Sequence, residues 1–232
     1  MSEYDKKARL YPTLLSATVP GMLLLWCLWN ILPLYFTTIP FLYRVLSTIG
    51  FVGVFIAACS FLGQEVCRRT SKYLFQFWFF KEDETYMPTT DLLIYEKSNF
   101  STQQIDNIRD KICSDFTILI PSKEQQIESL ELRKIITDAV RQIREKTRSN
   151  AILLDYNIRY GFCRNFLGGL SLGILFTFAL IIAILLNIVI VSIMPVIWAL
   201  IFQLILFTGA YFQLKGIAKE YARQLYNVYL TL

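Results

Sequence analysis

The stretch 166–214 decides the fold, and it reads FLGGLSLGILFTFALIIAILLNIVIVSIMPVIWALIFQLILFTGAYFQL, without a charged side chain. A helix needs about 20 mainly apolar residues to cross the hydrocarbon core of a bilayer, so this stretch is long enough for two spans. Asn187 and the sequence SIMP at 192–195 predict the break between them. The predicted spans lie near 166–190 and near 196–214.

A similar stretch lies close to the N-terminus, where Arg44 is the only charged residue within 10–64. Two prolines predict a tight turn around 33–40, because proline ends or bends a helix. The spans on either side of this turn are predicted near 12–32 and near 41–63. The chain is therefore expected to be an α-helical integral membrane protein with four transmembrane helices arranged as two hairpins.

The composition agrees with a membrane protein and excludes several kinds of enzyme. Hydrophobic residues make up 55% of the 232 residues and charged residues 18%, whereas soluble domains have roughly 45–50% and roughly 25%. The chain contains no histidine, so histidine bases, Ser-His-Asp triads and histidine-bearing zinc sites are excluded. A P-loop and a GxGxxG motif are also lacking. We expect no enzyme, no cofactor and no metal site.

Basic residues next to the predicted spans set the orientation in the membrane. One side of the membrane collects Lys6, Lys7, Arg9, Arg68, Arg69, Lys72, Arg159, Arg164, Lys215, Lys219 and Arg223, and the other side has Arg44 alone. Both termini and the central segment are therefore predicted to be cytoplasmic. The chain divides into an N-terminal tail with the first hairpin (1–64), a cytoplasmic domain (65–165), and the second hairpin with a C-terminal tail (166–232).

The central segment is predicted to be a small α/β domain. The short apolar runs 91–95 and 116–120 indicate strands. Capping signatures follow each run, Ser101 with Gln104 and Ser122 with Gln125. The predicted order is strand, helix, strand and long helix. No strong helix breaker occurs within 150–165, so a helix is expected to run from there into the third span.

Three arginines share one face of the predicted long helix, because Arg141, Arg144 and Arg148 have the spacing i, i+3 and i+7. Such a stripe suits the phosphates of a nucleotide, an oligonucleotide or lipid headgroups, or the docking of a partner protein. The alternative is a solvated face that pairs with Asp138 and Glu145. The sequence leaves both interpretations open.

Polar residues in the predicted spans have two interpretations as well. Asn30, Asn187 and Gln203 are candidates for interhelical hydrogen bonds or for the lining of a water path. Arg44 follows the turn at Pro40, where an arginine side chain reaches the headgroups at low cost. In a ring of subunits it would instead form a collar at a pore mouth.

Small residues at a spacing of four indicate close packing of helices in the membrane. Gly169 and Gly173 form a GxxxG motif in the third span, and Gly53 and Ala57 form a small-xxx-small pair in the second. These pairs predict helix contacts within one chain or between copies.

This plan, two hairpins around a cytoplasmic domain of about 100 residues without a catalytic set, resembles small bacterial four-transmembrane proteins of anti-phage defence systems. These include pore-forming effectors associated with second-messenger synthases and the membrane subunits of Hailong and Kiwa. The resemblance is one of architecture and assigns no functional residue. It implies an oligomeric protein of the bacterial inner membrane that responds to a cytoplasmic signal.

Two functions are therefore expected. The first is a homo-oligomeric channel or membrane-permeabilising effector that is gated through the cytoplasmic domain. The second is a membrane scaffold or sensor that anchors and regulates a cytoplasmic partner protein. The expected partners are membrane lipids, further copies of the chain, and a signalling nucleotide or partner protein. Direct binding of duplex nucleic acid is not expected.

Overall fold

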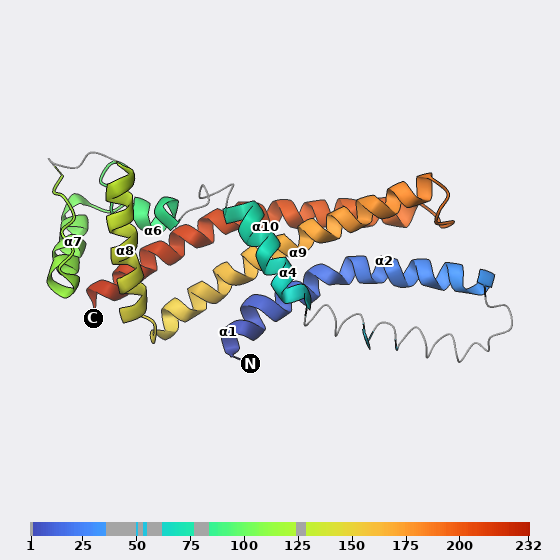
Figure 1. Ribbon diagram of the computed structural model, residues 1–232, viewed down its shortest axis with the longest axis horizontal. Coiled ribbons are helices and arrows are strands. Elements are labelled where there is room, and N and C mark those ends of the chain that lie inside the picture. The colour runs from blue at the N-terminus through green and yellow to red at the C-terminus, as the bar shows by residue number, and fades with distance from the viewer. Residues whose placement is uncertain (1, 36–49, 51–52, 55–61, 77–83, 124–128) are drawn as a thin grey trace. The chain divides into compact units, whose positions relative to one another are not determined.

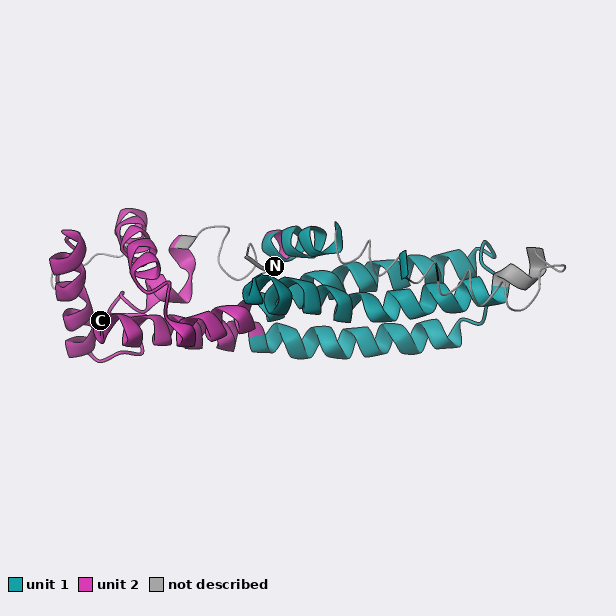
Figure 2. Cartoon of the chain, turned by 90° about the horizontal axis from the view of Figure 1, so that it is seen from below, with its two compact units in different colours: residues 1–72, 161–213 teal, residues 73–160, 214–232 magenta. Residues whose placement is uncertain are grey.

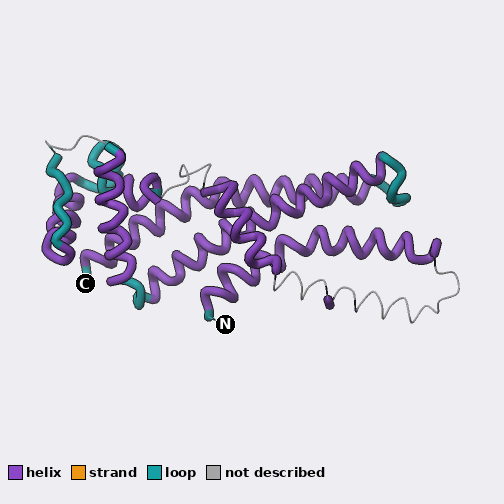
Figure 3. The backbone as a smooth tube through the Cα atoms, viewed as in Figure 1, coloured by secondary structure: helices purple, strands orange, loops and turns teal. Residues whose placement is uncertain are grey.

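The protein is mostly helical in the part described by the computed structural model, which covers residues 2–35, 50, 53–54, 62–76, 84–123 and 129–232 (Figure 1). Its labelled helices are α1 (Glu3–Asp5), α2 (Tyr11–Tyr35), α4 (Gln64–Ser71), α6 (Pro88–Asp91), α7 (Thr102–Phe116), α8 (Leu130–Lys146), α9 (Ala151–Leu185) and α10 (Met194–Leu230). The π-helical residues Lys6–Leu10 join α1 to α2. Figure 3 shows no strand within these described ranges.

Among the described residues, three helices are long and apolar enough to cross a membrane, and they comprise Glu3–Asn30, Ala151–Leu185 and Met194–Leu230. The predicted break between the last two is confirmed, because α9 ends at Leu185 and α10 begins at Met194. The predicted continuous helix into the third span is confirmed by α9. The predicted second span, near 41–63, lies almost entirely outside the described residues.

The chain forms two compact units (Figure 2). Unit 1 comprises residues 1–72 and 161–213, and unit 2 comprises residues 73–160 and 214–232. Both α9 and α10 contribute residues to each unit. This division differs from the predicted one, because residues 214–232 were expected to form a tail and instead belong to unit 2.

The prediction of an α/β domain is wrong for both proposed strands. Residues 91–95 contain the end of α6 and the turns that follow it, in which the Ile94 amide donates to the Asp91 carbonyl. The second run begins with the last residue of α7, and Thr117 then takes the left-handed conformation at φ 55°. Residues 118–120 have no ladder partner among the described residues.

Helices α7 and α8 supply much of the core of unit 2. The predicted cap of α7 is confirmed, because the Gln104 amide donates to the Ser101 hydroxyl over 3.2 Å. Its predicted apolar face is also confirmed, since Ile105, Ile108 and Ile112 are fully buried. The predicted cap Ser122 is wrong: α8 begins after Ser129, whose hydroxyl accepts from the Leu132 amide.

The C-terminal part of α10 completes this core. Leu225, Tyr226 and Tyr229 have no exposed surface. The Tyr226 hydroxyl donates to the Thr89 carbonyl over 2.6 Å, and the Tyr229 ring stacks on Phe116 with 6.1 Å between centroids. Unit 2 therefore depends on residues at the far end of the chain.

We predict that Tyr226→Ala lowers the free energy of unfolding of unit 2 by about 3–5 kcal/mol, the usual cost of removing a buried aromatic ring. Tyr73→Ala is the matched control, since that ring is 77% exposed and its removal is expected to cost less than about 0.5 kcal/mol. Hydrogen exchange of the full chain in detergent measures both. Equal effects of the two variants would show that 214–232 is a tail.

Candidate functional site

The helices of unit 1 approach most closely where α9 passes α4 and α2. A Cβ atom at Gly168 would lie 2.3 Å from the Cys67 carbonyl oxygen and 2.9 Å from the Ser71 backbone nitrogen. A Cβ at Gly169 would lie 1.9 Å from the Ser16 hydroxyl oxygen. These separations are far below van der Waals contact, so glycine is required at both positions.

A buried asparagine joins the same helices one turn earlier in α9. Asn165 is 1% exposed. Its Nδ2 donates to the Ala8 carbonyl over 2.6 Å, and its Oδ1 accepts from the Ser71 hydroxyl over 3.3 Å. The sequence analysis missed both Gly168 and Asn165. The available signals were the adjacent glycines at 168–169 and a lone amide at the start of an uncharged run.

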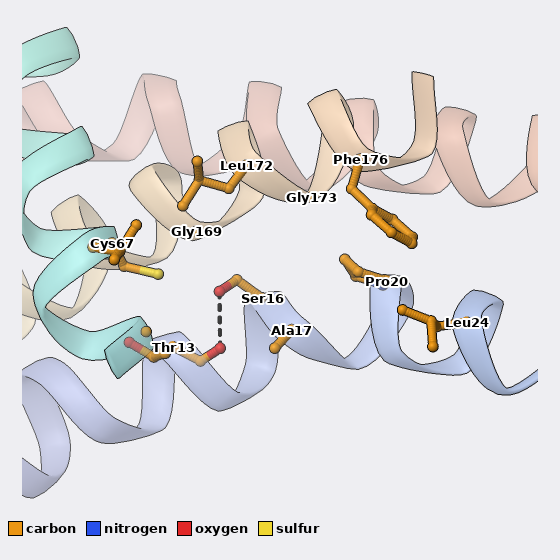
Figure 4. A pocket seen from close by; sticks show the side chains of 12 residues that line it. Thr13, Ser16, Ala17, Pro20, Leu24, Cys67, Gly169, Leu172, Gly173 and Phe176 are labelled. Carbon is orange, nitrogen blue, oxygen red and sulfur yellow. Dashed lines mark hydrogen bonds between the residues drawn. The ribbon is translucent and has the colours of Figure 1, made fainter. Parts of the chain in front are cut away.

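Unit 1 also contains a cavity of about 220 Å³ beside this crossing (Figure 4). Helices α2, α4 and α9 contribute its wall, which is made of Thr13, Ser16, Ala17, Pro20, Leu24, Gly63, Val66, Cys67, Gly169, Leu172, Gly173 and Phe176. The predicted GxxxG pair thus lies in this wall. Here Gly173 faces Pro20, whose Cγ would be 3.2 Å from an added Cβ.

The predicted amides occupy three different settings. Gln203 of α10 is fully buried, and its Oε1 lies 3.0 Å from the Thr177 hydroxyl of α9. Asn30 donates to the Trp26 carbonyl of its own helix over 2.7 Å. Asn187 lies in the connection after α9 with φ 56°. Of the three, Gln203 makes an interhelical hydrogen bond.

Two of the predicted residues, Arg44 and Ala57, lie outside the described residues. Gly53, the predicted packing partner of Ala57, is an exposed helical residue.

The arginines of α8 do not have equivalent surroundings. Arg141 lies 3.6 Å from Asp138 and Arg148 lies 3.1 Å from Glu145, so both predicted ion pairs are present and exposed. Arg148 is beyond the last residue of α8. Arg144 is half-buried, donates to the Met87 sulfur over 3.7 Å, and its Nε has no hydrogen-bond partner among the described residues.

An ionic cluster ties α7, α8 and α10 together in unit 2. The Asp115 carboxylate accepts from the Lys146 ammonium over 2.7 Å and from the Tyr229 hydroxyl over 2.8 Å. These two hydrogen bonds hold the pKa of Asp115 below its ordinary value, with the bond from Lys146 contributing most. Burial, followed by the neighbouring carboxylate, raises the pKa of Tyr229, so its hydroxyl remains a donor.

No group of three or more histidine, cysteine or acidic side chains suited to a metal ion occurs within the described ranges.

We predict that Gly168→Ala separates α9 from α4, because the added methyl meets backbone atoms that cannot rotate away. The expected loss of stability is about 1–3 kcal/mol, typical of overpacking. Gly209→Ala is the control, since a Cβ there meets no described atom within 4 Å. Unfolding by a denaturing detergent compares the two. Equal stabilities would contradict the close crossing.

We predict that the contribution of Asp115 to the stability of unit 2 falls with acidification. Because the folded-state pKa is lowered, the contribution is complete above the unfolded pKa of about 3.9 and disappears as pH falls through the folded value. The difference in unfolding temperature between wild type and Asp115→Asn should therefore shrink below about pH 4. A constant difference for Asp115→Asn would refute the prediction.

No protein-family model, curated protein or solved structure matches the chain.

Proposed function

We propose that the chain is a multi-pass protein of a bacterial inner membrane, and that several copies form a channel gated through unit 2. In this proposal the fourth span is formed by about 41–63, and both termini are cytoplasmic. The observation that carries the proposal is the continuity of α9 and α10. Each is a single helix with residues in the apolar unit 1 and in the core of unit 2, so a change in unit 2 has a covalent helical route into two spans.

The surface of α10 supports assembly of several copies. Only 11% of its most apolar 18-residue window is buried within the chain. The exposed remainder includes large apolar side chains such as Trp198, Phe202 and Ile205. Lipid or another copy of the chain would cover these side chains in the membrane.

The arginines of α8 are the proposed receiving surface in unit 2. Exposed ion pairs contribute about 0–1 kcal/mol, so Arg141 and Arg148 can exchange their carboxylate partners for an anionic ligand at low cost. Arg144 lies between them with a sulfur atom as the acceptor of its hydrogen bond. A signalling nucleotide or the acidic surface of a partner protein has the chemistry to engage all three.

A second candidate function is a scaffold or sensor that anchors a cytoplasmic partner without conducting ions. The setting of Gln203 favours it, because this α10 side chain is fully buried and accepts a hydrogen bond from Thr177 of α9, as an amide that holds two helices together does. Under this proposal the membrane helices hold unit 2 at the membrane, and the arginine surface selects the partner.

Potassium release from liposomes that contain the purified chain tests the channel. We expect release, together with an oligomer in native mass spectrometry, and a changed release rate for Tyr226→Phe, which loses the hydrogen bond to Thr89 in unit 2. Tyr73→Phe, altered at an exposed ring, should match wild type. A monomer that releases no potassium would overturn the channel. A stoichiometric partner from the native host, lost on replacing Arg141, Arg144 and Arg148 by glutamate, would then establish the scaffold.

A further inference from the structure

The cavity of unit 1 is apolar along nearly all of its wall (Figure 4). The two hydroxyl groups in the wall, those of Thr13 and Ser16, donate their hydrogen bonds to backbone carbonyls of α2 and of the turn before it. Thr13 donates to the Arg9 carbonyl over 2.8 Å, and Ser16 donates to the Thr13 carbonyl over 2.9 Å. These hydroxyl protons are therefore not offered to a polar ligand.

The size and chemistry of the cavity suit hydrocarbon. The cavity here is partly open and offers about 220 Å³, which exceeds the roughly 150 Å³ of an enclosed apolar cavity that binds benzene. Its walls come largely from α2 and α9, which are among the helices long and apolar enough to cross a membrane. In a membrane, the hydrocarbon available to such a cavity is the acyl chain of a lipid.

Two arginines of α4 lie next to the wall in sequence, because Arg68 and Arg69 directly follow the wall residue Cys67. Arg9, in the π-helical segment before α2, precedes the wall residue Thr13 by four positions and is paired with Asp5 over 2.9 Å. The side chain of Arg69 is 81% exposed and that of Arg68 41% exposed.

Among the described residues, Arg68 and Arg69 leave an excess of positive charge on α4. Arg68 and Arg69 share one carboxylate, since Glu65 lies 3.5 Å from the first and 3.0 Å from the second. Two guanidinium groups against one carboxylate have a net charge of +1, and Lys72 follows one turn later in an exposed position. A phosphate bound beside Arg68 and Arg69 would neutralise this remaining positive charge.

We propose that the cavity is a binding site for an anionic phospholipid, with an acyl chain between α2, α4 and α9 and the phosphate at Arg68 and Arg69. The site does not depend on the channel proposed above. A lipid there would join α4 to the two long helices beside the Gly168 and Gly169 crossing.

Native mass spectrometry of the full chain tests the acyl-chain part. The chain is extracted from vesicles of phosphatidylcholine with a minor fraction of phosphatidylglycerol, and retained lipid is counted. Ala17→Trp places a ring in the cavity and should abolish retention. Met22→Trp adds the same ring to α2 at a position that is 68% exposed and should retain lipid as wild type does. If the tryptophan variant does not fold, Ala17→Leu should still reduce retention.

A charge-removal pair tests the headgroup part. Arg68→Gln with Arg69→Gln should reduce the preference for phosphatidylglycerol over phosphatidylcholine by about fivefold per arginine. Lys219→Gln with Arg223→Gln removes the same charge from exposed positions of unit 2 and should leave the preference unchanged. Equal retention by Ala17→Trp, Ala17→Leu and Met22→Trp would overturn the site. An unchanged preference in the Arg68 and Arg69 variant would overturn its assignment to an anionic lipid.

Discussion

The packing of unit 1 depends on one steric constraint, the absence of side chains at Gly168 and Gly169. At these residues the backbone of α9 comes so near α4 and α2 that a methyl group would overlap the Cys67 carbonyl or the Ser16 hydroxyl. Glycine within a helix costs roughly 1 kcal/mol relative to alanine. The close approach offsets this cost by allowing van der Waals contact between helices, and it brings Asn165 within hydrogen-bond distance of two neighbouring segments.

The change from charged to uncharged sequence along the long helices lies close to the division between the units. Arg164 is the last charged residue before the uncharged run in α9, and Lys215 is the first after the run in α10. The two units divide at 160/161 and at 213/214, within a few residues of these positions. Ionised side chains are costly to bury in hydrocarbon, so the uncharged run of each helix is the part suited to a membrane. Arg164 still belongs to unit 1, whereas the charged residues from Lys215 onward belong to unit 2.

Features set by local sequence could be predicted, and features set by distant contacts could not. The Ser101 cap and the buried face of α7 depend on residues within a few turns, and both were predicted. The run at 91–95 predicts a strand by its sequence alone, but so short an apolar run has no decisive period. Its burial comes from α8 and the end of α10, more than a hundred residues further on in the latter case. The GxxxG spacing to Gly173 predicts that Gly169 lies at a helix contact. Asn165 belongs to no such spacing pattern, so its role could not be predicted.

The arginines near the end of α8 likewise show that sequence spacing does not reveal what a side chain contacts. Spacing places Arg141, Arg144 and Arg148 near one face, but it does not show what lies opposite. The structure gives two of them exposed carboxylate partners, and it turns the third toward Met87. A guanidinium that is partly removed from water and bonded to sulfur lacks the compensation that a carboxylate gives. An anion bound at this surface would therefore gain the most interaction energy from Arg144. Replacing Arg144 is for this reason the substitution that best distinguishes an anion-binding surface from a solvated face.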